Sequence, residues 1–173
     1  MSCSDSATPE RARDLLLSWL AERLTPDGQS WLDGKRSTGA ADRDFYMAFA
    51  LVPRKLGKQD LSLTQSELEQ ASKCRSGWAP VDWSIDQAAR MVLLLADPDR
   101  EDVFMRRLEK LCVTGDVGEL VTLYAGLPIF PFADRLTDRA AEGLRTNINA
   151  VFEAVAHGNP YPADHFEEGP WNQ

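Results

Sequence analysis

The sequence is poor in the residues that build disulfide frameworks and metal sites. Its three cysteines, Cys3, Cys74 and Cys112, are an odd number without a CxxC spacing. Disulfide-rich secreted domains usually carry an even number of cysteines, and zinc sites usually carry paired ligands. The two histidines, His157 and His165, are separated by a glycine and two prolines, so they lack the spacing of a helical HExxH site. The sequence therefore predicts neither a disulfide framework nor a metal site.

Long hydrophobic runs and an excess of positive charge are also missing. The longest apolar run, Met91 to Ala96, is far shorter than the roughly 20 residues that cross a bilayer. Residues 1–8 lack the basic start and apolar stretch of a secretory signal. A net charge of −8 disfavours binding to nucleic acid or to an anionic membrane surface. These observations predict a cytoplasmic protein that neither binds nucleic acid nor inserts into a membrane.

Helical periodicity is what the sequence has in abundance. Apolar residues recur at three- and four-residue spacing, and no segment alternates like a half-buried strand over more than about four residues. Helices are expected over residues 9–24, 42–52, 64–74, 84–96, 98–112, 116–127 and 136–157. The expected fold is all-α, with antiparallel helix hairpins that form either a short solenoid of the HEAT or TPR kind or an irregular helical bundle.

Several helix boundaries carry recognisable capping signals. Thr64 with Glu67, and Ser84 with Gln87, have capping-box spacing, in which each side chain bonds the backbone amide of the other residue. Asp116 follows a glycine and precedes an apolar run, so it is expected to cap the next helix. These signals predict three helix starts from the local sequence alone.

Proline and glycine set the expected interruptions. Residues 25–41 are polar and contain one proline and three glycines, which favours a long loop or one weak turn around Trp31 and Leu32. Pro53 is expected to end or kink the helix that begins at Asp42, because proline lacks the amide proton that a helix needs. The last helix, over residues 136–157, is expected to be continuous and to end at Gly158.

The domain organisation is expected to be simple. A length of 173 residues fits one domain with a substantial core. Residues 1–8 are expected to form a disordered N-terminus before a single helical domain over residues 9–173.

Sequence motifs for common chemistries are absent. The chain contains no GxSxG, no GxxxxGK[ST] and no GxGxxG motif. Nucleophilic catalysis, phosphate-loop chemistry and dinucleotide binding therefore lack their usual support. No catalytic residue and no cofactor is predicted.

Candidate ligand-binding residues lie near the C-terminus. Arg145 and Asn147 are proposed as polar anchors, because an arginine can bind a carboxylate or phosphate through two hydrogen bonds. Asn159 and Tyr161 would form a loop that closes over them, and His165 would complete the site. Two structural alternatives stay open: a solvated helical face with local ion pairs, and a rigid helix-exit turn that packs Tyr161.

A local basic groove is a related expectation. Six arginines fall between residues 100 and 145, at positions 100, 106, 107, 135, 139 and 145. A protein of net negative charge can therefore still hold a positively charged groove.

A set of short motifs, spread from about residue 10 to the end, carries a family resemblance. They are Arg43-Asp-Phe45 through Phe49 to Pro53-Arg54 and Leu56-Gly-Lys58, Trp83-Ser-Ile-Asp-Gln-Ala-Ala-Arg90, Asp138-Arg-Ala-Ala-Glu-Gly143, Arg145-Thr-Asn147, Asn159-Pro-Tyr-Pro162 and Trp171-Asn-Gln173. Together they resemble the EboA family of bacterial proteins. The last three motifs are the most specific.

The resemblance implies a soluble, largely helical protein of a gene cluster linked to the traffic of secondary metabolites from the cytoplasm towards the cell envelope. Neighbouring genes of the cluster resemble a membrane prenyltransferase, metal-dependent hydrolases and sugar-phosphate isomerase-like barrels. No catalytic residues carry over from the family. Relatives continue after the Trp-Asn-Gln segment, so the chain is expected to be short or truncated at its C-terminus.

Two functions from different classes follow. The first is a non-enzymatic helical binding or scaffold protein that assists secondary-metabolite biosynthesis and export, by holding a small-molecule metabolite or by docking other proteins of the gene cluster. The alternative is an enzyme, a lyase or isomerase acting on a small anionic metabolite, in which arginine binds the anion and histidine or tyrosine moves a proton.

Overall fold

The computed structural model describes residues 8–36 and 39–166. Most of the expected N-terminal tail, and the Trp171–Gln173 motif, lie outside this part. The regular structure of the described residues consists of α1 (Thr8–Ala21), α2 (Pro26–Lys35), α3 (Asp42–Leu56), α4 (Gln65–Cys74), α5 (Ile85–Leu94), α6 (Glu101–Thr114), α7 (Val117–Ala125), α8 (Thr137–Leu144), α9 (Asn149–Ala156) and α10 (Tyr161–His165), with two short 3-10 helices, η1 (Leu127–Ile129) and η2 (Ala133–Arg135). The prediction of an all-α fold is confirmed.

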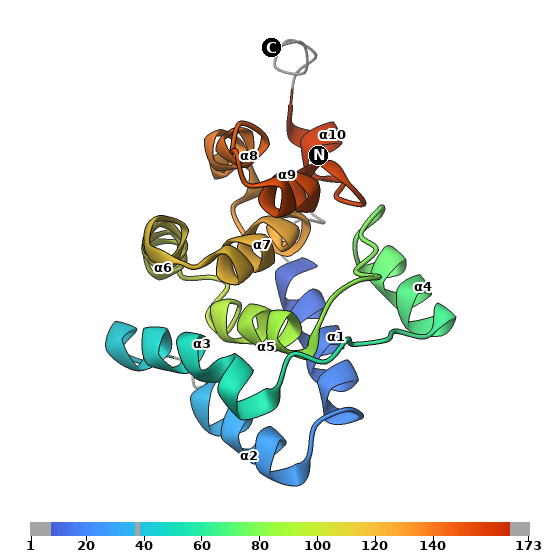
Figure 1. Ribbon diagram of the computed structural model, residues 1–173, viewed down its shortest axis with the longest axis vertical. Helices are drawn as coiled ribbons and strands as arrows, with labels where there is room; N and C mark the ends of the chain where they lie inside the picture. The colour runs from blue at the N-terminus through green and yellow to red at the C-terminus, as the bar shows by residue number, and fades with distance from the viewer. Residues whose placement is uncertain (1–7, 37–38, 167–173) are drawn as a thin grey trace.

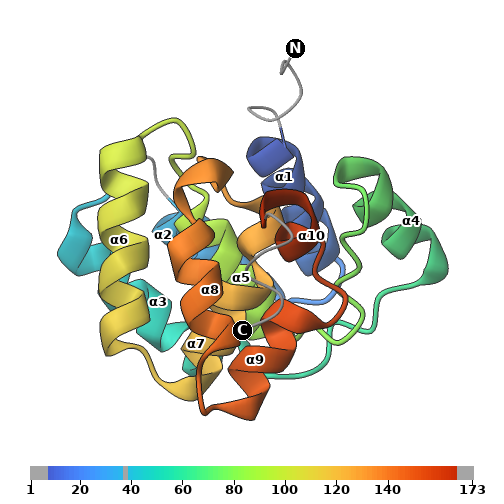
Figure 2. The same cartoon turned by 90° about the horizontal axis from the view of Figure 1, so that it is seen from above.

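Four helices form a row along the molecule. These are α3, α5, α7 and α9, and each packs against the next (Figure 1). A second helix pairs with three of them, because α2 packs on α3, α6 on α7 and α8 on α9. Helix α1 packs on α5, and α4 packs on α1. In the view from above, α4 and α6 lie at opposite edges of the molecule (Figure 2). Stacked helix pairs of this kind are the arrangement of a short solenoid.

Helix α5 lies at the centre of the core. Nine of its ten residues are buried, as expected for a helix that neighbours cover on every side. Two of the nine, Asp86 and Arg90, are charged, and a buried charge is tolerated only when it is paired. Among the described residues, no helix combines the length and apolar character needed to cross a membrane.

The capping signals are confirmed. Thr64 Oγ1 accepts a hydrogen bond from the Glu67 amide at 3.3 Å, and Gln87 Oε1 accepts one from the Ser84 amide at 2.9 Å. Asp116 Oδ1 accepts from the Glu119 amide at 2.8 Å. Each bond satisfies an amide that the first turn of a helix leaves unpaired.

The loop expected over residues 25–41 is wrong for most of its length. Residues 26–35 form α2, in which Thr25 Oγ1 accepts from the Gly28 amide at 3.2 Å and Pro26 occupies the first turn. Gly28 also lets the helix approach α3, since a Cβ at this position would lie 3.2 Å from Leu56 Cδ2. Glycine thus serves close packing here rather than a turn.

The single helix expected over residues 136–157 is also wrong, because it is two helices, α8 and α9. Thr146 Oγ1 accepts from the Ile148 amide at 3.2 Å and stabilises the turn between them. A Cβ at Gly143 would lie 2.5 Å from the Tyr124 ring and 2.8 Å from Val155, so this glycine allows α8, α7 and α9 to meet closely. The apolar four-residue stripe persists through both helices, which is why the break leaves no trace in the periodicity.

Candidate functional site

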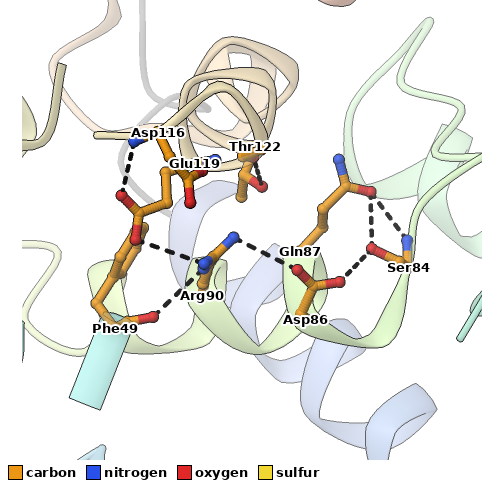
Figure 3. A network of polar contacts seen from close by, with 9 residues as sticks. Phe49, Ser84, Asp86, Gln87, Arg90, Asp116, Glu119 and Thr122 are labelled. Carbon is orange, nitrogen blue, oxygen red and sulfur yellow. Dashed lines mark hydrogen bonds and ion pairs between the residues drawn. The ribbon is translucent and has the colours of Figure 1, made fainter. Parts of the chain in front are cut away.

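A buried ionic network joins α3, α5 and α7 (Figure 3). Its centre is Arg90, whose side chain is 4% exposed. Arg90 Nη1 donates to Asp86 Oδ2 and Nη2 donates to Glu119 Oε1, each at 3.4 Å. Its Nε donates to the Phe49 carbonyl at 3.3 Å, and the guanidinium lies over the Phe49 ring, 5.3 Å from the ring centre.

Pro53 explains why the Phe49 carbonyl is available. In a regular helix the amide of residue 53 would donate to the carbonyl of residue 49, but proline has no amide proton. Helix α3 nevertheless continues through Pro53 to Leu56, so of the two expected outcomes, an end or a kink, the end at Pro53 is wrong. Arg90 supplies the missing donor from α5. One proline and one arginine thus join two helices of the central row.

The two carboxylates of the network have further partners. Ser84 Oγ donates to Asp86 Oδ1 at 2.6 Å, and Glu119 Oε2 accepts from the Asp116 amide at 3.1 Å. Each carboxylate is therefore fixed at the start of its own helix as well as to Arg90. The bonds are directed inward and Arg90 is covered, so we interpret this network as scaffold.

A different region holds a cavity of about 320 Å³. It lies among the start of α1, the segment after α5, the segment between η1 and η2, and α10. Its apolar walls consist of four of the ten prolines of the chain, two phenylalanines and one alanine: Pro9, Pro98, Pro128, Pro131, Phe130, Phe132 and Ala133. The remaining lining residues are Thr8, Arg75, Asp99, Asp134 and His165. Ligand sites commonly combine such apolar walls with a few polar groups.

The polar groups of this cavity are partly engaged with one another. His165 Nδ1 lies 3.4 Å from Asp134 Oδ1, and the imidazole stacks on the ring of Tyr161 with 4.4 Å between ring centres. Arg75 Nε donates to the Pro128 carbonyl at 3.2 Å, and its Nη2 donates to Asp164 Oδ2 at 2.5 Å. One arginine and two aspartates line the cavity, so its surroundings carry more negative than positive charge.

Phe132, in the wall of the cavity, has an unusual backbone conformation. Its φ of 58° and ψ of 39° lie in the left-handed region, which costs a residue with a side chain about 1–2 kcal/mol. This conformation turns the chain into η2, where the Arg135 amide donates to the Phe132 carbonyl at 2.9 Å. The rings of Phe130 and Phe132 both pack near Phe104, at 5.3 and 6.3 Å between ring centres. Backbone strain of this kind concentrates at ligand sites.

The five predicted site residues do not line one cavity. Arg145 and Asn147 are exposed in the turn between α8 and α9. His165 lines the cavity described above, whereas Asn159 lines a second cavity of about 320 Å³ beside α9. Tyr161 is fully buried and lines neither cavity.

Asn159 and Tyr161 make the contacts of the helix-exit turn that the sequence left open as an alternative. Asn159 Nδ2 donates to the carbonyls of Tyr124 and Ala154 at 3.1 and 2.9 Å, and its Oδ1 accepts from the Tyr161 amide at 3.0 Å. The Tyr161 hydroxyl donates to the Ala133 carbonyl at 2.5 Å. Burial, and then the charge of Asp134, raise the pKa of Tyr161, so its hydroxyl stays protonated as a donor.

Most of the cavity walls were missed by sequence reasoning. The segment from Pro128 to Phe132 does carry a local signal, since it holds two prolines and two phenylalanines in five residues. Pro9, Arg75 and Pro98 carry none, because only the tertiary fold brings them to this segment. Within the described residues, no three His, Cys, Asp or Glu side chains are placed to hold a metal ion.

Comparison with known families identifies the family to which the chain belongs. The family described as metabolite traffic protein EboA matches residues 12–173. This chain belongs to the EboA family. The resemblance expected from the short motifs is thus confirmed over nearly the whole sequence. No curated protein and no solved structure gives a significant match.

Membership of the EboA family supports a role in metabolite traffic. Every residue that lines the cavity, except Thr8 and Pro9, lies inside the matched region. The Arg90 network lies inside it as well. The EboA match therefore covers both the scaffold and the cavity.

Proposed function

We propose that this EboA-family protein is a non-enzymatic carrier that binds a small metabolite in the cavity lined by proline and phenylalanine. The observation that carries the proposal is the wall itself, with four prolines and two phenylalanines around about 320 Å³. Proline rings lose little conformational freedom when a ligand binds, so such a wall is preorganised for an apolar partner. Shielding an apolar metabolite from water suits a role in metabolite traffic.

The charges around the cavity restrict the chemical class of the ligand further. Asp99 and Asp134 outnumber Arg75, and Arg75 already bonds Pro128 and Asp164. An anion would meet like charge here without a free arginine to bind it. The favoured ligand is a neutral, largely apolar molecule with one hydrogen-bonding group for His165.

One observation favours the second candidate, an enzyme of the lyase or isomerase class. The His165 and Asp134 pair places a carboxylate beside one imidazole nitrogen, an arrangement that orients a histidine for general base catalysis. Tyr161, the other proton carrier that the sequence suggested, is committed to the Ala133 carbonyl. The enzyme candidate therefore rests on His165 alone, and the carrier is the better-supported function.

Binding of 1-naphthol, a neutral aromatic probe with one hydroxyl, tests the proposal. Ala133→Phe fills the cavity without removing the backbone carbonyl that accepts from Tyr161, and Ala163→Phe adds the same ring at an exposed position of α10. Isothermal titration calorimetry should show binding to the wild type and to Ala163→Phe, and at least tenfold weaker binding to Ala133→Phe. Equal affinity for all three proteins would contradict the cavity as the binding site.

A mass-spectrometric assay separates carrier from enzyme. Metabolites released from the protein purified from its native cells are added back to fresh protein. A carrier returns them with unchanged mass and structure. Conversion that disappears in His165→Gln would support the enzyme instead.

A further inference from the structure

A positively charged hollow lies on α3 and α6, away from the cavity. Its volume is about 470 Å³, and its lining residues are Asp42, Arg43, Tyr46, Met47, Arg106 and Lys110. Three cations against one carboxylate give this hollow two positive charges, on a chain whose net charge is −8. In the view from above, α6 lies at the edge of the molecule, with α8 between it and α10 (Figure 2).

Residues at helical spacing on α3 and on α6 line the two sides of the hollow. On α3, Asp42 and Tyr46 are four residues apart, and on α6, Arg106 and Lys110 have the same spacing. Residues at this spacing share one face of a helix. Two helices therefore present matching polar faces to the same space.

Arg106 and Lys110 are held in place before any ligand arrives. Arg106 donates to both carboxylate oxygens of Asp42, at 2.8 and 3.3 Å. The same carboxylate accepts from Arg107 Nε at 3.0 Å, and the hydrogen bond from Arg106 is the main cause that lowers the pKa of Asp42. Lys110 Nζ lies 4.4 Å from the centre of the Tyr46 ring. Arg106 Nη1 also lies 3.9 Å from Asp102 Oδ2, so the uncompensated positive charge of the hollow comes from Arg43 and Lys110, which form no ion pair among the described residues.

The hydroxyl of Tyr46 is an unsatisfied polar group next to the hollow. This oxygen is buried, and it finds no hydrogen-bond partner among the described residues. Buried hydroxyls are nearly always bonded, and an unbonded one costs free energy. Met47, whose side chain is 53% exposed, adds an apolar surface beside it.

We infer that this hollow binds a small organic phosphate, a phosphate monoester with an apolar body. Arg43 and Lys110 bind the phosphate oxygens through charge-assisted hydrogen bonds, whereas Arg106 stays paired with Asp42 and fixes the wall of the hollow. Met47 and the ring of Tyr46 contact the apolar body of the ligand. The site is separate from the cavity, so the protein has two binding sites of opposite character.

Phenyl phosphate is the probe, with inorganic phosphate as the reference ligand without an apolar body. At low ionic strength, calorimetry should show phenyl phosphate binding several-fold more tightly than inorganic phosphate. The double variant Arg43→Gln/Lys110→Gln should weaken phenyl phosphate binding at least tenfold.

Lys58→Gln/Lys73→Gln is the matched control. It removes the same two positive charges at exposed positions outside the hollow, and it should leave the affinity unchanged. Equal weakening in both double variants would overturn the inference, because binding would then follow net charge alone. Equal affinity for inorganic and phenyl phosphate would also overturn it. Binding of 1-naphthol is tested with other variants, so the proposal for one site can be disproved without affecting the proposal for the other.

Discussion

Arg90 and Arg75 make nearly the same contacts in two regions of very different character. Each donates its Nε to a backbone carbonyl and an Nη to an aspartate. The Arg90 side chain is 4% exposed, and it has a second carboxylate, from Glu119, to bond. The Arg75 side chain is 22% exposed and borders a cavity. The surroundings, and not the contacts of the arginine, separate scaffold from candidate binding site.

The difference also appears in the backbone. Near Arg90, Pro53 lies inside a regular helix and leaves a carbonyl for the arginine. Near Arg75, Pro9 and Pro128 lie at the starts of α1 and η1, Pro98 and Pro131 lie between helices, and all four line the cavity. Phe132 is held there in a left-handed conformation. Proline thus serves to join helices in one region and to form a rigid wall in the other.

The largest expected effect is the loss of stability when the buried arginine is removed. Arg90→Met leaves Asp86 and Glu119 buried without their cation, which should lower the free energy of unfolding by about 3–5 kcal/mol. Arg75→Met removes a partly exposed pair and should cost about 1 kcal/mol. Urea denaturation of both variants measures the two values. Similar losses of unfolding free energy in the two variants would contradict the proposed difference between the regions.

A smaller effect tests the link between Pro53 and Arg90. Pro53→Ala restores an amide that competes with Arg90 for the Phe49 carbonyl. In the Arg90→Met background the carbonyl is unpaired, so the restored amide should stabilise the protein by about 1 kcal/mol more than it does in the wild type. A double-mutant cycle measured by urea denaturation gives this coupling. A coupling near zero would show that the two residues act independently.

An effect of about the same size is expected at the strained wall of the cavity. Phe132→Gly and Phe132→Ala remove the same ring, but only glycine adopts the left-handed conformation without cost. Phe132→Gly should therefore be more stable than Phe132→Ala by about 1 kcal/mol, in thermal unfolding followed by circular dichroism. Both should bind 1-naphthol more weakly than the wild type. A more stable alanine variant would mean that the backbone at Phe132 is not strained.

Local features of the fold could be predicted well from the sequence. The caps at Thr64, Ser84 and Asp116 involve partners only three residues away, so the signal and its cause lie in one short segment. The break between α8 and α9 could not be predicted in this way, because the apolar stripe has the same period on both sides. Its cause includes the contact of Gly143 with Tyr124, which only the packed structure supplies.

The candidate site was harder to predict than the fold. Of the proposed residues, His165 lines the cavity, while Asn159 bonds carbonyls at the ends of two helices. A polar residue that caps a helix and one that binds a ligand look alike in a sequence, since both depend on distant partners. The bond between Arg90 and Phe49 spans 41 residues, and the cavity wall draws on segments that are further apart still.

Intermolecular nuclear Overhauser effects between 1-naphthol and the protein test the central claim most directly. The two cavities of about 320 Å³ provide an internal comparison, because one is lined by Phe130 and Phe132 and the other by Val81 and Ala150. The account predicts effects from the naphthol ring protons to Phe130 and Phe132, and their loss in Ala133→Phe. Effects to Val81 and Ala150 instead, or none at saturating naphthol, would contradict it.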